Sequence, residues 1–254
     1  MLGEPMRTQF DWNFKLFDFP IRISAWFWLA ALLIGQGASR GNPQYMLVWI
    51  AVVFVSILIH ELGHAFAFRY YGVSAQIVLY HFGGLAIPNS IGSVWGQPDR
   101  THDPRNHIVI SAAGPGLQIL SAVALAIVLK VGGYQVPFEL LERLIPLPGG
   151  TPIPSELITV SVIFYMFVSV FWALLNLLPV YPLDGGQIAR DLFVLFGGAD
   201  ALPRSLMLST FAAGAVALYS FMKIQEPFLG IMFALLGYSS YQALQAYTGG
   251  YRRG

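Results

Sequence analysis

Long apolar segments are the feature of this sequence that most restricts its fold. The second of them, Met46–Phe68, has 23 residues. At 1.5 Å per residue it makes about 34 Å of helix, enough to cross the ~30 Å hydrocarbon core of a bilayer. Lipid cannot satisfy backbone polar groups, so only helices and closed barrels span it. The sequence therefore predicts an all-α polytopic membrane protein with about six transmembrane helices, at Ser24–Ala38, Met46–Phe68, His107–Leu129, Glu156–Leu178, Ser205–Met222 and Pro227–Tyr247.

Composition supports the membrane assignment and limits the partners. Charged residues make up 11% of the 254 residues, whereas soluble domains carry roughly 25%. The net charge of +1 disfavours nucleic acid as a partner. Without cysteine the chain has neither disulfides nor thiolate metal ligands. The loops are too short to hold a separate soluble domain, so we expect residues 1–254 to form one integral membrane domain within the lipid bilayer.

Lys and Arg are unevenly shared between the loops, and this asymmetry predicts the orientation. If the N-terminus is placed in the cytoplasm, ten of these residues lie on the inner side, from Arg7 to the pair Arg252 and Arg253. Four lie on the outer side: Arg40, Lys130, Arg143 and Lys223. We therefore expect both termini in the cytoplasm.

The connection between the second and third segments, about residues 72–106, has a pattern of its own. Its first part, Ala75–Pro88, holds two apolar, β-prone runs around Gly83-Gly84, which is typical of a hairpin. The apolar side chains suggest that this hairpin enters the bilayer, where surrounding protein shields its backbone. We expect a short membrane-associated β-hairpin here.

Ionisable residues gather inside the second apolar segment, in the stretch HELGH. Ser56 is the only polar side chain in the 14 residues before His60, Glu61 and His64. An acidic residue at mid-bilayer costs roughly 2.5–3.5 kcal/mol even on the mildest scale. Two imidazoles at i and i+4 share a helix face and can bind one zinc ion, with the glutamate beside them as general base for the metal's water. Because a bound cation satisfies all three groups at once, we favour a zinc site over a chance match.

A zinc hydrolase needs a third protein ligand. His102 and His107 lie in or beside a polar stretch and are expected to face solvent, whereas His81 lies in the hairpin. Asp184 follows two prolines that break the fourth segment and precedes Gly185-Gly186. Alone, this pattern also fits an aspartate that caps the next helix; together with the histidine pair it favours a ligand. To reach the histidines, the fourth helix must begin deeper in the membrane, or the broken stretch must double back.

Taken together, these motifs resemble the site-2 protease family of intramembrane zinc metalloproteases. HELGH and the later stretch NLLPVYPLDG carry most of the resemblance, and the Gly83-Gly84 hairpin, Ala113-Gly114-Pro115 and Phe17–Ile23 add to it. The third segment departs from the family pattern, because Gln118 stands where the family often has Asn.

The resemblance implies a site, a reaction and a setting. It implies one zinc ion per chain, held by His60, His64 and Asp184, with Glu61 as general base and Asn176 as a helper near the site. It also implies that the chain cleaves a membrane-anchored protein substrate near one membrane face. Within the family, the chain resembles the six-span form that lacks PDZ-like and CBS-like domains. This form includes bacterial proteases, so we expect the chain to lie in a bacterial cell membrane.

Two other functions are alternatives to the endopeptidase. A membrane metal-ion transporter would use the same three groups as a transit site, but transport predicts polar residues along several helices rather than at one level. A catalytically silent membrane scaffold would keep the fold without turnover, and the intact Glu61 argues against it.

The orientation is testable by labelling single cysteines, since the native chain has none. A cysteine near Arg7 or Arg252 should resist an impermeant reagent applied outside, and one near Gly149 should react. The reverse pattern would overturn the orientation and place the site near the other membrane face.

Overall fold

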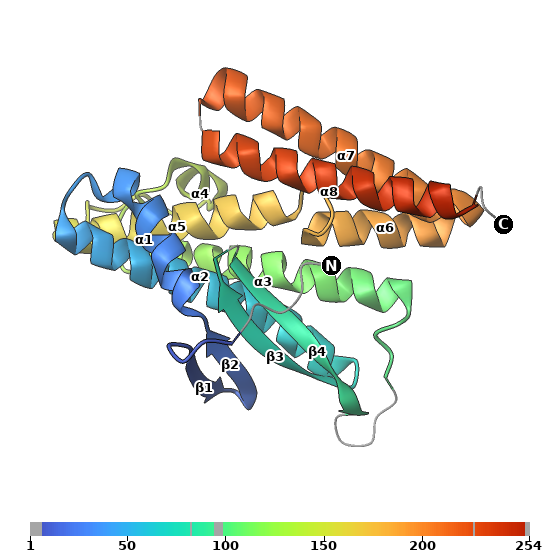
Figure 1. The fold of residues 1–254 in the computed structure, drawn as a ribbon. Coiled ribbons are helices and arrows are strands. Elements are labelled where there is room, and N and C mark those ends of the chain that lie inside the picture. Colours follow the sequence, from blue (N-terminus) through green and yellow to red (C-terminus); the bar gives the residue numbers. More distant parts are fainter. Residues whose placement is uncertain (1–6, 82, 94–98, 226, 252–254) are drawn as a thin grey trace. The chain divides into compact units, whose positions relative to one another are not determined.

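The computed structural model describes residues 7–81, 83–93, 99–225 and 227–251 (Figure 1). The chain forms two compact units, Met1–Asp99 with Ala113–Ala173, and Arg100–Ala112 with Leu174–Gly254. Helix α3 (Pro104–Val131) therefore contributes its first turns to the second unit and the remainder to the first. Arg252 and Arg253, which are predicted to lie on the cytoplasmic side, are outside the described residues.

The first unit contains a four-stranded sheet in the order β1-β2-β3-β4. The expected hairpin is present, because β3 and β4 pair antiparallel with Tyr80 opposite Gly83. It is not alone, since β1 and β2 form a second hairpin and β2 runs parallel to β3. The predicted hairpin is therefore confirmed, and the other two strands of the sheet were not predicted. The strands are β1 (Trp12–Leu16), β2 (Phe19–Ile23), β3 (Val73–Tyr80) and β4 (Gly83–Ser93).

One face of the sheet is apolar and buried. Phe19, Ile21 and Ile23 of β2 are 1–2% exposed, and Ile77 and Leu79 of β3 are fully buried. The alternation places these side chains on one face. Helices α1 (Ala25–Ser39) and α2 (Pro43–Tyr70) pack against the sheet, so that it forms a structural base for α2.

Helix α2 is fixed at both of its ends. At its start, the Asn42 side chain accepts a hydrogen bond from the Gln44 N–H at 2.9 Å and Pro43 occupies the first helical position, which is a favourable N-cap arrangement. In its last turn, the Arg69 guanidinium lies 3.7 Å from the centre of the Phe19 ring. Helix α2 is therefore tied to strand β2 close to the sheet.

Helices α3 and α5 (Glu156–Asn176) complete the first unit, together with the short α4 (Glu139–Leu144). A cluster of small and medium apolar side chains, among them Ala122, Ala126 and Met166, lies buried between them. The buried Lys130 ammonium donates to the backbone carbonyls of Glu142, Ile145 and Leu147 at 2.8–3.2 Å. Its charge is thereby paired with backbone dipoles, and the loop after α4 is held against α3.

The second unit is built on an antiparallel pair of helices, α7 (Ala201–Tyr219) and α8 (Pro227–Tyr251), which a π-helical turn at Ser220–Ile224 joins. Ala213, Ala217 and Phe233 pack at their interface together with Val180 from the preceding loop. Helix α6 (Asp184–Phe196) packs against α7. The loop before α6 is consequently part of the core of this unit.

A helix covers each of the six predicted apolar segments, but not all of them meet the requirements for a span. Within the described residues, four helices are long and apolar enough to cross a membrane: α2, α3, α5, and α7 continued through Ile224. Helix α1 is apolar but has only 15 residues. The structure thus supports a mostly helical membrane protein, while the count of six spans stays a prediction.

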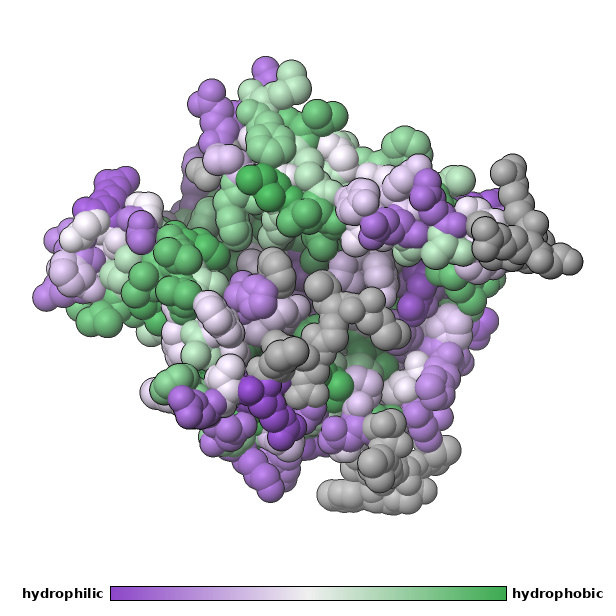
Figure 2. All heavy atoms as spheres, in the orientation of Figure 1, coloured by the Kyte–Doolittle hydropathy of each residue, from purple (hydrophilic) through white to green (hydrophobic). Residues whose placement is uncertain are grey.

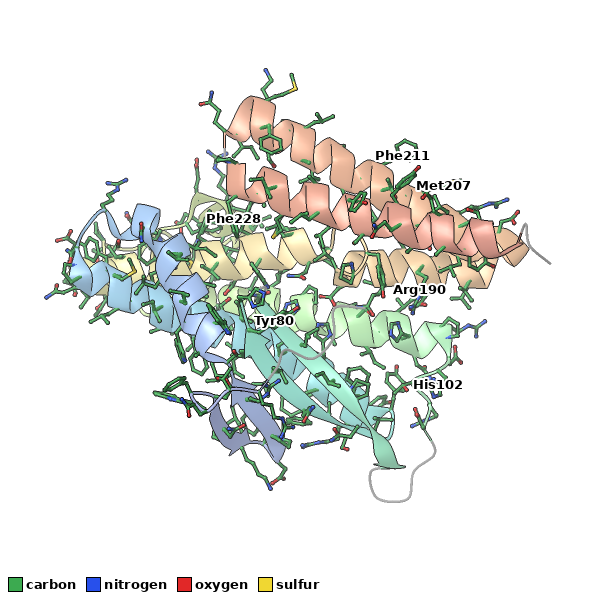
Figure 3. All side chains as sticks on the ribbon, in the orientation of Figure 1. Tyr80, His102, Arg190, Met207, Phe211 and Phe228 are labelled. Carbon is green, nitrogen blue, oxygen red and sulfur yellow. The ribbon has the colours of Figure 1, made fainter. Side chains whose placement is uncertain are left out.

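Large apolar side chains on the outside of the helices fit a lipid-facing surface. Hydrophobic residues cover much of the face drawn in Figure 2. On helices α7 and α8, Phe211 is 77% exposed and Phe228 is 62% exposed, and both are labelled in Figure 3. Exposed apolar surface of this extent is unusual for a soluble protein and ordinary for helices in a bilayer.

Candidate metal centre

His60 and His64 lie one turn apart on α2 and face each other. Their Nε2 atoms are 3.1 Å apart, and their rings meet edge to face at 4.8 Å between centroids. Both side chains are buried, at 3% and 8% exposure. The i, i+4 spacing therefore brings the two nitrogens to one point, as the sequence predicted.

Glycines make room for this pair of rings between α2 and α3. A Cβ at Gly114 would lie 2.2 Å from His64 Nε2, and a Cβ at Gly63 would lie 2.3 Å from the Ala113 carbonyl oxygen. Neither distance is compatible with a side chain. The small-residue run Ser111–Gly116 thus serves close helix packing, and its closest approach accommodates the imidazole of His64.

Glu61 is also buried, at 4% exposure, and lies against the beginning of strand β4. A Cβ at Gly84 would lie 2.4–2.6 Å from the Glu61 side chain, so a side chain there would displace the carboxylate. Burial, and then the charge of Glu61, raise the pKa of Tyr80 to about 12. Tyr80, labelled in Figure 3, therefore stays a neutral phenol near the carboxylate at physiological pH. The sequence had marked Gly83-Gly84 as a turn signal and had not assigned a role to Tyr80.

Asp184 is the first residue of α6, and a tightly folded loop presents it. Helix α5 ends at Asn176, and the chain from Leu177 to Leu183 turns back on itself. A Cβ at Gly185 would lie 2.1 Å from the Leu177 carbonyl oxygen, and one at Gly186 would lie 2.4 Å from the Tyr181 nitrogen. The loop is thus compact, with its two ends in contact, and the route by which Asp184 reaches the depth of the histidines stays a prediction.

Side chains of the helix pair hold this loop in place. The Tyr181 N–H donates to the Ser209 hydroxyl at 3.1 Å, and the Ser240 hydroxyl donates to the Tyr181 carbonyl at 3.3 Å. Both backbone groups of Tyr181 are satisfied in this way, which a buried non-helical segment requires. The position of Asp184 consequently depends on α7 and α8 as well as on its own helix.

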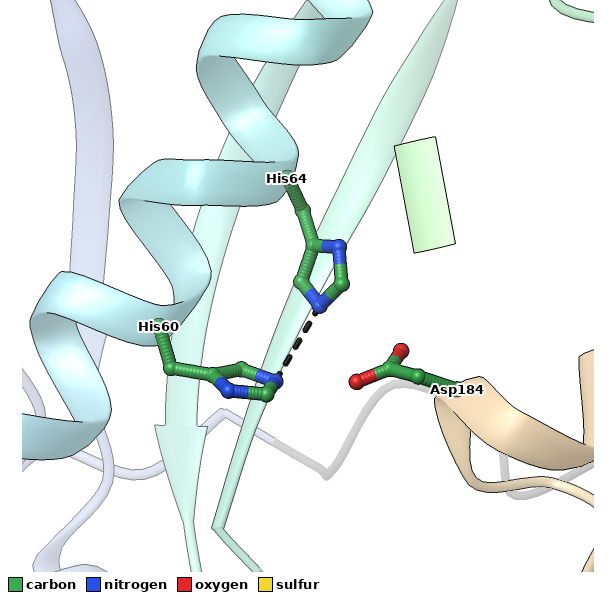
Figure 4. A group of neighbouring side chains, drawn as sticks. All are labelled: His60, His64 and Asp184. Atoms are coloured by element: carbon green, nitrogen blue, oxygen red, sulfur yellow. Dashed lines mark hydrogen bonds between the residues drawn. The ribbon is translucent and has the colours of Figure 1, made fainter. Parts of the chain in front are cut away.

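The ligand atoms of His60, His64 and Asp184 lie within 4.8 Å of one another, and Figure 4 draws the three side chains. Two imidazole nitrogens and one carboxylate are a donor set that zinc hydrolases use. Two Zn–N bonds of about 2.0–2.1 Å at a tetrahedral ion would place the nitrogens roughly 3.3 Å apart, close to the 3.1 Å observed. The residues present thus fit a zinc ion without rearrangement of the histidines.

The other histidines lie outside this group. His81 is exposed at the turn between β3 and β4, and His102 is exposed as expected. His107 differs from the expectation, because it is only partly exposed and its Nδ1 lies 2.5 Å from the Asp191 carboxylate. Burial opposes ionisation of Asp191, but hydrogen bonds from His107 and Arg190 outweigh it and lower the pKa of this carboxyl. Arg190, labelled in Figure 3, completes this separate ion-pair cluster.

Asn176, the expected helper, is the last residue of α5 and is partly buried. It lies eight residues before Asp184, at the point where the helix gives way to the loop. Gln118 of α3 is fully buried, and its side-chain oxygen lies 3.0 Å from His60 Nδ1. The residue that departs from the family pattern thus touches one of the candidate ligands directly.

The sequence around this site matches a known protein family. The pattern of Peptidase family M50 matches residues 48–218, which include the histidine pair, Glu61 and Asp184. The chain belongs to peptidase family M50. The resemblance to site-2 proteases is thereby confirmed. A zinc metalloprotease of Methanocaldococcus jannaschii is 27% identical to this M50 chain over 183 residues, which cover 70% of the chain and 43% of the relative.

A solved structure has a similar fold. The structure of a site-2 protease from Methanocaldococcus jannaschii matches the M50 chain with a TM-score of 0.54 and 22% identity. The match covers 92% of this chain and 95% of the other. The chain spans less than half the length of the curated relatives it matches.

Metal analysis of the purified protein tests the proposed ligands. The wild-type chain should hold about one zinc ion, and His60→Ala, His64→Ala and Asp184→Ala should each lose it or bind it much more weakly, because a structural or catalytic zinc site needs three protein ligands or more. His102→Ala is a matched control, since His102 is exposed and outside the group. Full zinc retention in Asp184→Ala would exclude it as the third ligand and direct attention to His81.

Proposed function

We propose that this chain is an intramembrane zinc endopeptidase. It hydrolyses a peptide bond within or near a transmembrane segment of a membrane-anchored protein, as part of regulated intramembrane proteolysis. One observation carries the proposal: His60, Glu61 and His64 are buried in a helix that is long and apolar enough to cross a membrane. Family membership supports it.

The roles follow from the chemistry of each group. His60, His64 and Asp184 would hold a zinc ion, which would polarise the scissile carbonyl and lower the pKa of the attacking water toward ~7. Glu61 would accept a proton from that water and deliver it to the leaving nitrogen. Burial raises the pKa of Tyr80, so its phenol near Glu61 stays protonated and can donate a hydrogen bond. Asn176 is proposed as a polar helper near the reacting peptide.

The setting is part of the proposal. We place the chain in a bacterial cell membrane as a single six-span domain with both termini in the cytoplasm. The uneven distribution of Lys and Arg supports the orientation. We propose α1 and α8 as the two further spans; tilt or local thinning of the bilayer would accommodate the shorter α1.

Glu61→Gln tests the role of the base. Glutamine is nearly isosteric with glutamate but cannot accept the proton of the water, so the variant should bind zinc normally and lose roughly 10²–10⁴-fold in cleavage rate. Membrane proteomes of cells with wild-type and variant protein would be compared. A substrate should accumulate uncut in the variant. Turnover near the wild-type rate would refute the assignment, and unchanged proteolysis with altered metal uptake by the cells would favour the transporter.

Cleavage also requires that the substrate helix open. The backbone hydrogen bonds of a helix in lipid are closed on themselves, and unsatisfied groups there are expensive. An unwound segment therefore needs new partners. Strand β4 can supply them, because it lies at the edge of the sheet whereas β3 is paired on both sides. We propose that β4 binds the unwound substrate by strand addition.

Two changes test this capture. Replacing helix-breaking Gly, Pro or Asn residues near the cut site of the substrate with Leu should slow cleavage, since the helix then opens less readily. Proline at Leu85 or Ala86 of β4, or at Val78 or Leu79 of β3, should impair turnover and leave zinc bound, because proline removes a backbone donor from the sheet. If cleavage is indifferent to substrate helicity and to all four prolines, β4 does not bind the substrate, although the metal chemistry stands.

A further inference from the structure

A chain of hydrogen bonds leads away from His60 through three helices of the first unit. His60 Nδ1 on α2 lies 3.0 Å from Gln118 Oε1 on α3. Gln118 Nε2 donates to the Ser56 hydroxyl at 2.8 Å, one turn before His60 on α2. The Ser56 hydroxyl in turn lies 2.8 Å from the hydroxyl of Ser169 on α5. Four side chains thus form one continuous polar path beside the metal centre.

Burial makes each bond in this path consequential. Gln118, Ser56 and Ser169 are fully buried and His60 is 3% exposed. A polar group left unpaired at such a depth costs about 1–3 kcal/mol, and water is not at hand to replace a lost partner.

The backbone of Ser56 determines which way the Gln118 amide is turned. Gln118 Nε2 also lies 3.4 Å from the Ser56 backbone carbonyl, which can only accept. The amide nitrogen must therefore face Ser56, and the amide oxygen must face His60. Because that oxygen can only accept, His60 carries its proton on Nδ1. A neutral imidazole with its proton on Nδ1 has its lone pair on Nε2, the atom that faces His64.

We propose that Gln118 is a positioning residue that fixes the tautomer and ring orientation of His60 for metal binding, with Ser56 and Ser169 fixing Gln118 in turn. This inference rests on the zinc site of the proposed function and adds three residues to it. Partners of this kind behind a metal-binding histidine orient the ring and raise its basicity. Here an amide takes the place in which a carboxylate or a backbone carbonyl is common.

The same helices carry a matched control. Tyr165, one turn before Ser169 on α5, donates to the Ser121 hydroxyl on α3 at 2.7 Å. Ser121 in turn donates to the Gln118 backbone carbonyl and not to its side chain. Tyr165→Phe thus removes a polar contact between α5 and α3 without touching the amide that meets His60. A loss that came only from weakened helix packing would appear in Tyr165→Phe as well.

The test is zinc affinity, measured on the full-length protein in detergent by competition with a chromophoric chelator. Gln118→Leu should bind zinc about 10–100-fold more weakly, as is typical when such a partner is removed. Gln118→Asn keeps the amide but is one methylene too short to reach, so it should weaken binding to a similar degree. Gln118→Glu keeps an acceptor at the same reach and should restore affinity. Ser169→Ala should show a smaller loss, and Tyr165→Phe should match the wild type.

A second measurement separates positioning from stability. The thermal midpoint of the metal-free protein reports helix packing, and the visible spectrum of the cobalt-substituted protein reports the ligand geometry. The proposal is supported if the cobalt bands change in Gln118→Leu while the thermal midpoint of its metal-free form stays close to that of metal-free Tyr165→Phe. Wild-type zinc affinity in Gln118→Leu would overturn it. If that variant does not fold, equal affinities of Gln118→Asn and Gln118→Glu would overturn it instead.

Zinc affinity is measured without substrate, so the two proposals fail separately. A chain that binds zinc in the expected order of variants and yet cleaves nothing would count against the endopeptidase and not against Gln118. A chain that cleaves its substrate with Gln118→Leu at full zinc affinity would count only against Gln118.

Discussion

The cost of placing ionisable groups inside an apolar helix governs the structure around α2. His60, Glu61 and His64 are all buried, and each needs a partner that a lipid-facing helix cannot provide. On neighbouring elements, the Gln118 amide lies against His60, and Gly114 and Gly84 leave room for the side chains of His64 and Glu61. The buried amide and the small residues therefore accommodate the ionisable groups, and a bound cation would complete their pairing.

Much of this arrangement was predictable because it is local. The i, i+4 spacing of the histidines determines their common helix face, and long apolar runs determine the helices; both follow from helix geometry alone. The prediction of α2 as Met46–Phe68 and the observed Pro43–Tyr70 differ only at the ends. Asp184 was a harder case, because the local sequence fitted both a cap and a ligand. The structure places it at the start of α6, where it can serve the metal group as well.

What the sequence did not reveal depends on contacts between distant segments. Strands β1 and β2 were missed because Trp12–Ile23 is short, and its pairing with β3 joins residues more than 50 positions apart, such as Ile21 and Ile77. The compact fold of the loop at Leu177–Leu183 is held by Ser209 and Ser240, which lie on later helices. The partner of His60 was visible only as a departure from a family pattern. No local periodicity carries information of this kind.

Gly84 links the shape of the sheet to the chemistry of the site. The Glu61 side chain lies so close to this position that a Cβ there would be 2.4 Å away. Residues on one face of a strand recur every second position, so a slip of β4 by two residues would bring the Cβ of Ala86 against the carboxylate. A slip by one residue would turn the side chain of Leu85 toward it. The register of β4 against β3 and the position of the carboxylate are therefore linked sterically, and a substrate strand added to this edge would be aligned relative to Glu61 by the same contact.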